Sequence, residues 1–419
     1  MPTLAVLLLA IPPLAFAQAD STPIYQPSKV SASLAPITLR AALDAAWALH
    51  PVSRASANRG AELSARARAA QSFTSGPPSI SLAHRTDALS GNAGLREVEA
   101  EMQVPLWNPG MRRATQNLVA ADVNALALQH NAERLKLAGE VRAAAAQIAL
   151  ARAERDAAAR KHLEASQLAD DVERRVKAGD LARVDSLQSR ASAQQAQGQL
   201  AVQDAALVRA LSQWRAMTGQ TQVVELQESI LGAAAQNTAA NPSVEHPALL
   251  AAQAQVQSAH ARLALTESDR RDPMELGLGV TRERAAAGAN LETSLRFALR
   301  IPLGGDSRNA PKLAAARAEL DAAQAQADAV VRQLDVDLAA ASAGLDAAIS
   351  QEALAVQRAE LSGQMQALVA KSHRLGESDL PTRMRADNEK LDADLSLARA
   401  RIELQRAMSQ LNQSLGTFP

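Results

Sequence analysis

The chain has 419 residues, and its 44 basic side chains match 44 acidic ones, so the formal net charge is zero. Hydrophobic residues make up 47% but aromatic residues only 2%, and alanine, which buries little area, supplies much of the apolar content. This balance argues against a nucleic-acid partner, which needs a basic excess, and against a thick globular core, while it suits long, closely packed helices.

The first residues read as an export signal. A short apolar run from Leu4 ends in Ala15-Phe16-Ala17, the small-x-small pattern that precedes signal-peptidase cleavage, and Ala17-Gln18-Ala19 is a second candidate. We predict a signal peptide over residues 1–17, cleaved after Ala17 or Ala19, and a proline-containing linker over 18–36; the alternative is an uncleaved apolar tail. No later apolar stretch is long enough for a transmembrane helix, so a spanning element would have to consist of strands.

The rest of the chain is an internal duplication. Val104-Pro105-Leu106 recurs as Ile301-Pro302-Leu303 at an offset of 197 residues (301 − 104), and Gly179-Asp180 recurs as Gly376-Glu377 at the same offset. Each copy is expected to contain a helix, two strands, a very long helix, a glycine-containing turn and a return helix. The predicted ranges are repeat one over 37–219, a linker over 220–243 and repeat two over 244–419.

The helices begin at recognisable positions. His50-Pro51 and His246-Pro247 open the first helix of each copy, because proline fits a first turn. Asn108, followed by Pro109, is expected to cap the first long helix, and Asp306 the second. The long helices are predicted over about 108–175 and 306–373, with turns at 176–182 and 374–380. A coiled-coil-like seam is expected at Val119, Val123, Leu126, Leu137, Val141 and Ile148.

The strands alternate strictly between apolar and polar residues. They are predicted over about 78–87 and 95–106 in repeat one, and over about 275–284 and 290–303 in repeat two. Such alternation needs an apolar medium on one face and water on the other, and about ten tilted residues span an outer-membrane hydrocarbon layer. Side chains expected to face pore water are Glu97, Glu99, Glu101, Arg296 and Arg300. Because four strands cannot close in lipid, about three chains and twelve strands are needed; the alternative is a soluble hairpin packed on the helices.

No motif for catalysis or cofactor binding is present. The sequence has no nucleophile elbow, phosphate loop or dinucleotide fingerprint, and its seven histidines are scattered without metal-ligand spacing. There is no cysteine, which excludes disulfides and thiolate metal sites. We expect no enzyme activity, no catalytic residue, no cofactor and no metal site.

The order of elements resembles the TolC family of outer-membrane efflux proteins over about Ile37 to Gly416. The resemblance is carried by the duplication, by the strand-to-helix junctions at 104–110 and 301–306, and by the turns at 176–185 and 374–383. The second turn is most similar to the heavy-metal (cobalt-zinc-cadmium type) resistance branch.

This resemblance implies a mainly α fold with a small β part. Three protomers would join their four strands each into a transmembrane β-barrel, continued by an α-barrel of long helical hairpins into the periplasm of a Gram-negative cell. The implied function is the outer-membrane channel of a tripartite efflux system, a passive duct for small solutes, with heavy-metal cations as one cargo. The implied partners are two further copies of the chain, a periplasmic adaptor (membrane fusion) protein, an inner-membrane RND-type pump and outer-membrane lipid.

The resemblance also assigns residues. The turns at the periplasmic tip, where family members meet the adaptor, contain Gly179, Asp180, Leu181, Gly376, Glu377 and Ser378. A gate is implied at Asp185, Thr382, Arg383 and Arg385. The strand-to-helix junctions contain Pro105, Asn108, Pro109, Pro302 and Asp306. Thr382 departs from the family, which often has aspartate there, and His50 and His246 replace the usual asparagine.

A different class of function stays open. An exported structural coiled-coil protein with soluble hairpins would show the same helices and the same strand alternation. The scarcity of aromatic residues favours this alternative, because outer-membrane barrels usually carry aromatic girdles and here only Trp107 and Phe297 lie near the expected positions.

Overall fold

The computed structural model describes residues 38–229, 245–304 and 306–419. The signal peptide and the linker predicted over 1–36 lie outside the described residues. Residues 230–244, which include most of the second predicted linker, also lie outside them.

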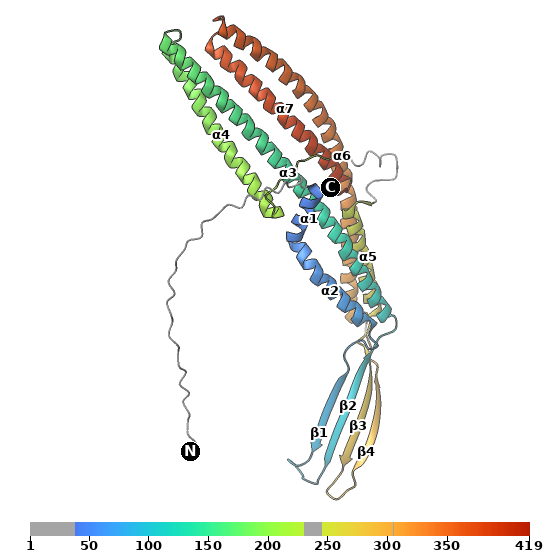
Figure 1. The fold of residues 1–419 in the computed structure, drawn as a ribbon. Coiled ribbons are helices and arrows are strands. Elements are labelled where there is room, and N and C mark those ends of the chain that lie inside the picture. The colour runs from blue at the N-terminus through green and yellow to red at the C-terminus, as the bar shows by residue number, and fades with distance from the viewer. Residues whose placement is uncertain (1–37, 230–244, 305) are drawn as a thin grey trace, which may run out of the picture. The chain divides into compact units, whose positions relative to one another are not determined.

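The described part contains eleven helices and strands, six in the first half and five in the second, and apart from an additional short helix at the start of the first half their order is the same (Figure 1). They are α1 Leu39–Leu49, α2 Pro51–Gln71, β1 Ser79–Thr86, β2 Arg96–Leu106, α3 Met111–Ala178, α4 Arg183–Thr218, α5 Pro247–Ser268, β3 Met274–Arg284, β4 Glu292–Arg300, α6 Asp306–Arg374 and α7 Leu380–Ser414. The predicted fold class, mainly helical with four strands, is confirmed.

Two long helical hairpins, α3–α4 and α6–α7, lie side by side with their turns at the same end (Figure 1). At 1.5 Å per residue, the 68 residues of α3 extend about 100 Å. Helix α3 also contacts α5 and α7, so several of its faces are covered at once. Alanine allows this, because its small side chain lets neighbouring backbones approach closely. The buried alanines of α3 are Ala125, Ala138, Ala145, Ala146, Ala151, Ala157 and Ala169.

The largest apolar core lies where α1 and the end of α4 pack on α3. Trp214 of α4 is completely buried there, and its Nε1–H donates to the carbonyl oxygen of Gln222 at 2.9 Å. Val141 and Ile148 of the predicted seam belong to this core. Val123 does not belong to a seam, because 48% of it is exposed. The three- and four-residue spacing therefore identified most of the buried stripe, including Val119 near the start of α3, but wrongly included Val123.

The four strands form one antiparallel sheet in the order β1-β2-β3-β4. Met102 of β2 lies opposite Ile80 on one side and Leu278 on the other, and Leu278 lies opposite Phe297. The central pairing of β2 with β3 joins the two repeats. Strands β1 and β4 are the two edges of the sheet.

Two predicted boundaries, and the predicted role of Asp306 as a helix cap, are corrected by the structure. The first long helix begins at Met111 rather than near Asn108, because Gly110 adopts a left-handed conformation (φ 83°) that cannot continue a helix. Asn108 therefore does not cap this helix. Helix α6 begins at Asp306 itself, so Asp306 is its first residue and not the residue before it; its side chain lies outside the described residues. The last strand ends at Arg300, which pairs with Glu275, rather than at residue 303.

Among the described helices, none is both long enough and apolar enough to cross a membrane.

Candidate functional site

The sheet exposes its apolar face. Residues directly opposite in an antiparallel pair point to the same side, so the register places the apolar side chains of all four strands on one face. Leu295 and Phe297 are 72% and 76% exposed. The other large exposed members of this face are Ile80, Leu82, Val98, Met102, Leu276, Leu278, Val280 and Leu299. A continuous apolar surface of this kind marks a region that meets lipid or another protein.

The opposite face of the sheet is polar, and its arginines are paired. Arg296 Nη1 lies 2.7 Å from Glu99 Oε1, and Arg300 Nη1 lies 3.3 Å from Glu275 Oε2. Arg85 Nη1 lies 3.8 Å from Glu97 Oε2. The predicted polar set Glu97, Glu99, Glu101, Arg296 and Arg300 therefore shares one face.

Two buried glycines of β3 lie beneath these charged side chains. A Cβ placed on Gly277 would come within 2.8 Å of Glu101 Oε1 and 3.2 Å of Ala298 Cβ. The absence of a side chain lets Glu101 fold over the strand. Along β3 the polar positions are covered and the apolar ones exposed, the reverse of a sheet that packs on a soluble core.

Side-chain hydrogen bonds hold the junction between helices and sheet. Asn108 is buried, and its Nδ2 donates to the Arg271 carbonyl oxygen at 2.7 Å. Trp107 Nε1 donates to the Ser72 carbonyl at 3.0 Å. Pro105 lies inside β2 opposite Glu275, and its carbonyl accepts from Ser75 N at 3.1 Å.

The remaining junction residues lie outside regular structure or at its edge. Pro109 is in the turn between β2 and α3, and Pro302 is in the connection between β4 and α6. Gly304 lies two residues after Pro302, and a Cβ there would clash with the Arg270 carbonyl oxygen. The chain thus needs glycine where it passes close to the end of α5.

The two helical tips are built in the same way. Gly179 and Gly376 have φ of 90° and 79°, the left-handed region that glycine reaches without steric cost. Asp180 N donates to Arg175 O at 2.9 Å, and Glu377 N donates to Ser372 O at 3.0 Å. These bonds from two residues past the helix satisfy carbonyls of its last turn. Leu181 and Ser378 complete the two turns, and the Ser378 carbonyl lies 3.0 Å from His373 Nδ1.

The return helices begin with a carboxylate in both copies, but at different positions. Asp185 Oδ2 accepts from the backbone N of Ala182 at 3.3 Å. In copy two, Asp379 Oδ1 accepts from Thr382 N at 3.1 Å. Hydrogen bonding by the Thr382 side chain, and then this backbone bond, lowers the pKa of Asp379. Asp379 is the counterpart of Ala182 at the repeat offset of 197 (379 − 182). Copy two therefore keeps a tip carboxylate, three residues earlier than in copy one.

The structure does not bring the four proposed gate residues together within one chain. Arg383 Nε lies 3.4 Å from Asp387 Oδ2 on its own helix, and Arg385 Nη2 donates to Thr382 Oγ1 at 3.4 Å. Among the described residues, no hydrogen bond or ion pair links Asp185 to Thr382, Arg383 or Arg385.

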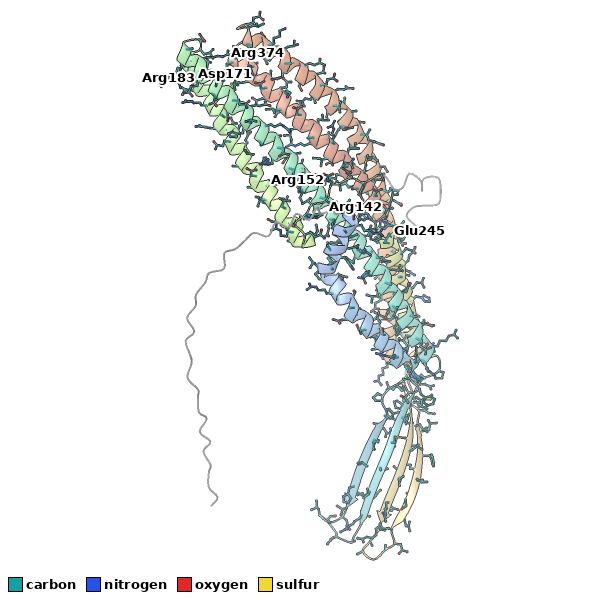
Figure 2. All side chains as sticks on the ribbon, in the orientation of Figure 1. Arg142, Arg152, Asp171, Arg183, Glu245 and Arg374 are labelled. Carbon is teal, nitrogen blue, oxygen red and sulfur yellow. The ribbon has the colours of Figure 1, made fainter. Side chains whose placement is uncertain are left out.

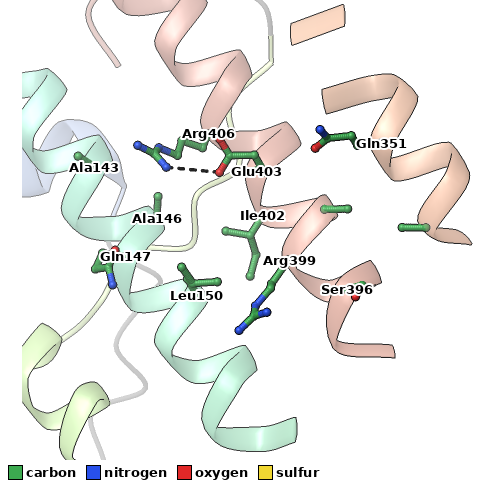
Figure 3. Close-up of a pocket in the computed structure, with 12 residues that line it drawn as sticks. Ala143, Ala146, Gln147, Leu150, Gln351, Ser396, Arg399, Ile402, Glu403 and Arg406 are labelled. Atoms are coloured by element: carbon green, nitrogen blue, oxygen red, sulfur yellow. Dashed lines mark hydrogen bonds and ion pairs between the residues drawn. The ribbon is translucent and has the colours of Figure 1, made fainter. Parts of the chain in front are cut away.

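A groove of about 580 Å³ separates the two hairpins midway along α3 (Figure 3). Leu150 and Ile402 contribute apolar surface, while Glu403 and Arg406 form an ion pair at 3.4 Å beside it. Arg399, which also lines the groove, reaches across to Glu154 of α3 at 2.5 Å. The groove is therefore a partly charged surface rather than a pocket for an apolar ligand. Over residues 38–229, 245–304 and 306–419, no group of three or more His, Asp or Glu side chains could hold a metal ion.

Solved structures with the same architecture are outer-membrane proteins. The outer membrane protein VceC of Vibrio cholerae superposes with a TM-score of 0.71 at 15% identity, over 91% of this chain and 97% of VceC. The Campylobacter jejuni outer membrane channel CmeC gives a TM-score of 0.72 at 12% identity, over 97% and 94%. CusC, studied for transmembrane channel formation, gives 0.73 at 14% identity, over 94% and 99%. No protein-family model and no curated protein matches the sequence.

The chain has the fold of these outer-membrane channels. The likeness extends over nearly the full length of both partners, so the sheet and both helical hairpins are included. At 12–15% identity, the likeness to these structures assigns no role to individual residues. Sequence reasoning missed Asp379, although an aspartate followed two residues later by proline is a helix-start signal. It also missed the buried Arg142–Glu228 ion pair, for which no local signal exists.

Proposed function

We propose that the chain is one protomer of a trimeric outer-membrane channel that serves as the passive duct of a tripartite efflux system. The observation that carries the proposal is the sheet, whose apolar face is exposed while its charged face is internally paired. Lipid on the apolar face and water on the charged face satisfy both surfaces. The long hairpins at the other end of the chain would continue the duct into the periplasm.

Unpartnered edges support assembly from three copies. Edge strands β1 and β4 have free backbone groups on one side, which cannot face lipid unpaired. Pairing β1 of one copy with β4 of the next would close about twelve strands around a water-filled pore. The outer helices α4 and α6 also expose apolar side chains that a neighbouring copy would cover: Leu187, Val202, Val208, Val336, Leu354, Leu361 and Leu368.

The tips define the proposed contact with the partners. Gly179, Asp180 and Leu181 of one turn and Gly376, Glu377 and Ser378 of the other would meet a periplasmic adaptor protein, which connects the duct to an inner-membrane RND-type pump. The two turns share one backbone geometry, so three chains would offer six similar contacts around the ring. The pump would supply both the energy and the choice of substrate, because no described part of this chain forms a closed ligand site.

The proposed cargo is small solutes, with heavy-metal cations as one class. The resemblance of the second tip turn to the heavy-metal branch supports this class, and the tip carboxylates Asp185 and Asp379 suit passing cations. A strain without the protein should become more sensitive to cobalt, zinc or cadmium salts than its parent. Sensitivity to organic solutes alone would point to another cargo while leaving the duct intact.

Leu295→Arg and Ser294→Arg test the membrane assignment directly. Leu295 lies on the apolar face and Ser294 beside it on the polar face, and both are exposed. In lipid, arginine at position 295 should cost about 2–4 kcal/mol and deplete the trimer from the outer-membrane fraction, while arginine at 294 should be tolerated. In a soluble hairpin both changes would stay within about 0.5 kcal/mol. Equal behaviour of the two variants, in a monomer extracted without detergent, would refute the proposal.

A further inference from the structure

Three arginines lie on the apolar face of the sheet at its hairpin end. Arg96 is directly opposite Arg284, and Arg282 is directly opposite Val98. Residues 96 and 98 share a side of β2, as do 282 and 284 of β3, so all three arginine side chains leave the sheet on the side of Val98, Met102 and Leu278. The apolar face thus ends in a basic row, which we call the arginine row: Arg96, Arg282 and Arg284.

The arginine row has no carboxylate partner. In the described part of the chain, no Asp or Glu oxygen lies within 4.0 Å of these three guanidinium groups, whereas Arg85, Arg296 and Arg300 on the other face are all ion-paired. Within the arginine row, Arg284 Nε donates a hydrogen bond to the Gly94 carbonyl oxygen at 3.4 Å.

The nearest acidic residues are directed elsewhere. Glu97, Glu283 and Glu292 occupy the opposite face at this end of the sheet, as their register shows. Asp87, in the turn after β1, accepts a hydrogen bond from Gly94 N at 3.1 Å. At this end of the sheet the carboxylates of the strands therefore lie on the polar face, whereas the three arginines without an ion pair lie on the apolar face.

This arrangement calls for an external anion. Like charges directly opposite each other across two strands are destabilising, as Arg96 and Arg284 are here. Arginine binds phosphate with two parallel hydrogen bonds, and its long stem can lie along an apolar surface while the head reaches the boundary with water. A row of such heads at the edge of an apolar band is complementary to lipid headgroups that carry phosphate.

We propose that the arginine row binds the phosphate groups of an anionic outer-membrane lipid where the hydrocarbon layer meets the headgroups. The inference rests on the proposed function, because it takes the apolar face as the surface in contact with lipid. It adds a specific lipid-recognition site to a sheet whose polar-face arginines are ion-paired within the chain. Bound lipid would also offset the repulsion between Arg96 and Arg284.

The test uses the purified, detergent-solubilised full chain and diphosphoryl lipid A as the probe. Native mass spectrometry and fluorescence titration would compare the wild type with the triple variant Arg96→Gln/Arg282→Gln/Arg284→Gln. Loss of three charges near an anionic surface should weaken binding about 100-fold. Arg85→Gln is the matched control, because Arg85 is an exposed arginine at the hairpin end of the sheet but on the opposite face. This variant should bind diphosphoryl lipid A like the wild type.

Two further arms identify the source of the phosphate. Monophosphoryl lipid A should bind more weakly than the diphosphoryl form, and inorganic phosphate at millimolar concentration should not displace the lipid. Wild-type binding should weaken as salt is raised, a reading that needs no variant and so holds even if the triple variant misfolds. Displacement by inorganic phosphate would overturn the lipid assignment in favour of a free anion.

The outcome is separable from that of the proposed function. A triple variant that still forms a conducting trimer and binds diphosphoryl lipid A as tightly as the wild type would overturn this inference alone. A wild-type chain that stays monomeric and does not conduct would instead contradict the channel assignment.

Discussion

The guanidinium of Arg142 donates hydrogen bonds to both carboxylate oxygens of Glu228, with Nε 3.0 Å from Oε2 and Nη2 2.8 Å from Oε1. Their side chains are only 4% and 6% exposed. Arg142 also donates to Gln413 Oε1 at 2.7 Å and to the Thr417 carbonyl at 3.2 Å. One side chain midway along α3 therefore ties together repeat one, the segment after α4 and the end of repeat two (Figure 2).

Breaking this pair from one side should destabilise the chain strongly. Arg142→Met leaves Glu228 buried without a partner, and such changes cost about 3–5 kcal/mol. The double variant Arg142→Met/Glu228→Leu removes both charges and should recover most of the loss. Chemical unfolding followed by circular dichroism measures the difference. Arg155→Met is the control, because its ion pairs with Asp204 and Asp156 lie at the surface and should contribute little. Equal effects at both sites would contradict a special role for Arg142.

Local patterns predicted the helices and strands, whereas the family resemblance implied how they are arranged. Alternation along β2 and β4 and the three- and four-residue spacing in α3 are short-range properties, so the sequence reveals them. The contacts of Asn108 and Arg142 are not short-range: Asn108 bonds to Arg271 and Arg142 to Glu228 and Gln413. Asn108 looked like a helix cap because of Pro109, but the left-handed conformation of Gly110 delays the start of the helix to Met111.

The candidate-site residues also divide into those that local sequence predicts and those that depend on long-range contacts. Gly179 and Gly376 were predictable because a turn between antiparallel helices requires a left-handed residue. Asp185 was assigned as a gate by family position, and the structure shows only its bond to Ala182 at the start of α4. A gate needs surfaces from several chains, which a single sequence does not specify. The assignments at the tips and the gate therefore stay predictions.

Replacing the tip glycines should strain the turns without causing clashes. No atom lies within 4 Å of a Cβ built on Gly179 or Gly376, so the cost comes from the left-handed backbone, about 1–2 kcal/mol each for alanine. Gly198 is the matched control: it too has open space, but it lies inside α4, where alanine should stabilise by about 0.5–1 kcal/mol. Thermal unfolding would compare the three variants. The tip variants should also weaken binding of the adaptor, which Gly198→Ala should leave intact.

Folding stability should fall in mild acid because of His246. Its Nδ1 accepts from Ala248 N at 3.2 Å at the start of α5, and burial lowers its pKa from the ordinary 6.5. The folded state therefore favours neutral imidazole, and the unfolded state takes up a proton first as the pH falls. Stability should be complete above about pH 6.5 and decline as the pH drops from there to the lowered pKa of the folded state.

His246→Asn should reduce this pH dependence, because asparagine can cap the helix without titrating. The measurement is the free energy of unfolding at a series of pH values between neutral and mildly acidic. His50→Asn is the control for the same replacement at the corresponding helix start of repeat one, since the His50 side chain makes no capping bond there. An unchanged slope in His246→Asn would assign the pH dependence to other groups.

Removing the charge of Asp185 should raise the conductance of the isolated trimer if this carboxylate narrows the duct. Asp185→Ala removes both the charge and the hydrogen bond to Ala182 N, whereas Asp185→Asn removes the charge and keeps an acceptor for that bond. A charge effect requires both variants to conduct better in planar bilayers, with reduced preference for cations. An increase in the alanine variant alone would instead reflect a loosened start of α4, since losing such a bond costs about 1 kcal/mol. Unchanged conductance in both variants would remove Asp185 from the gate.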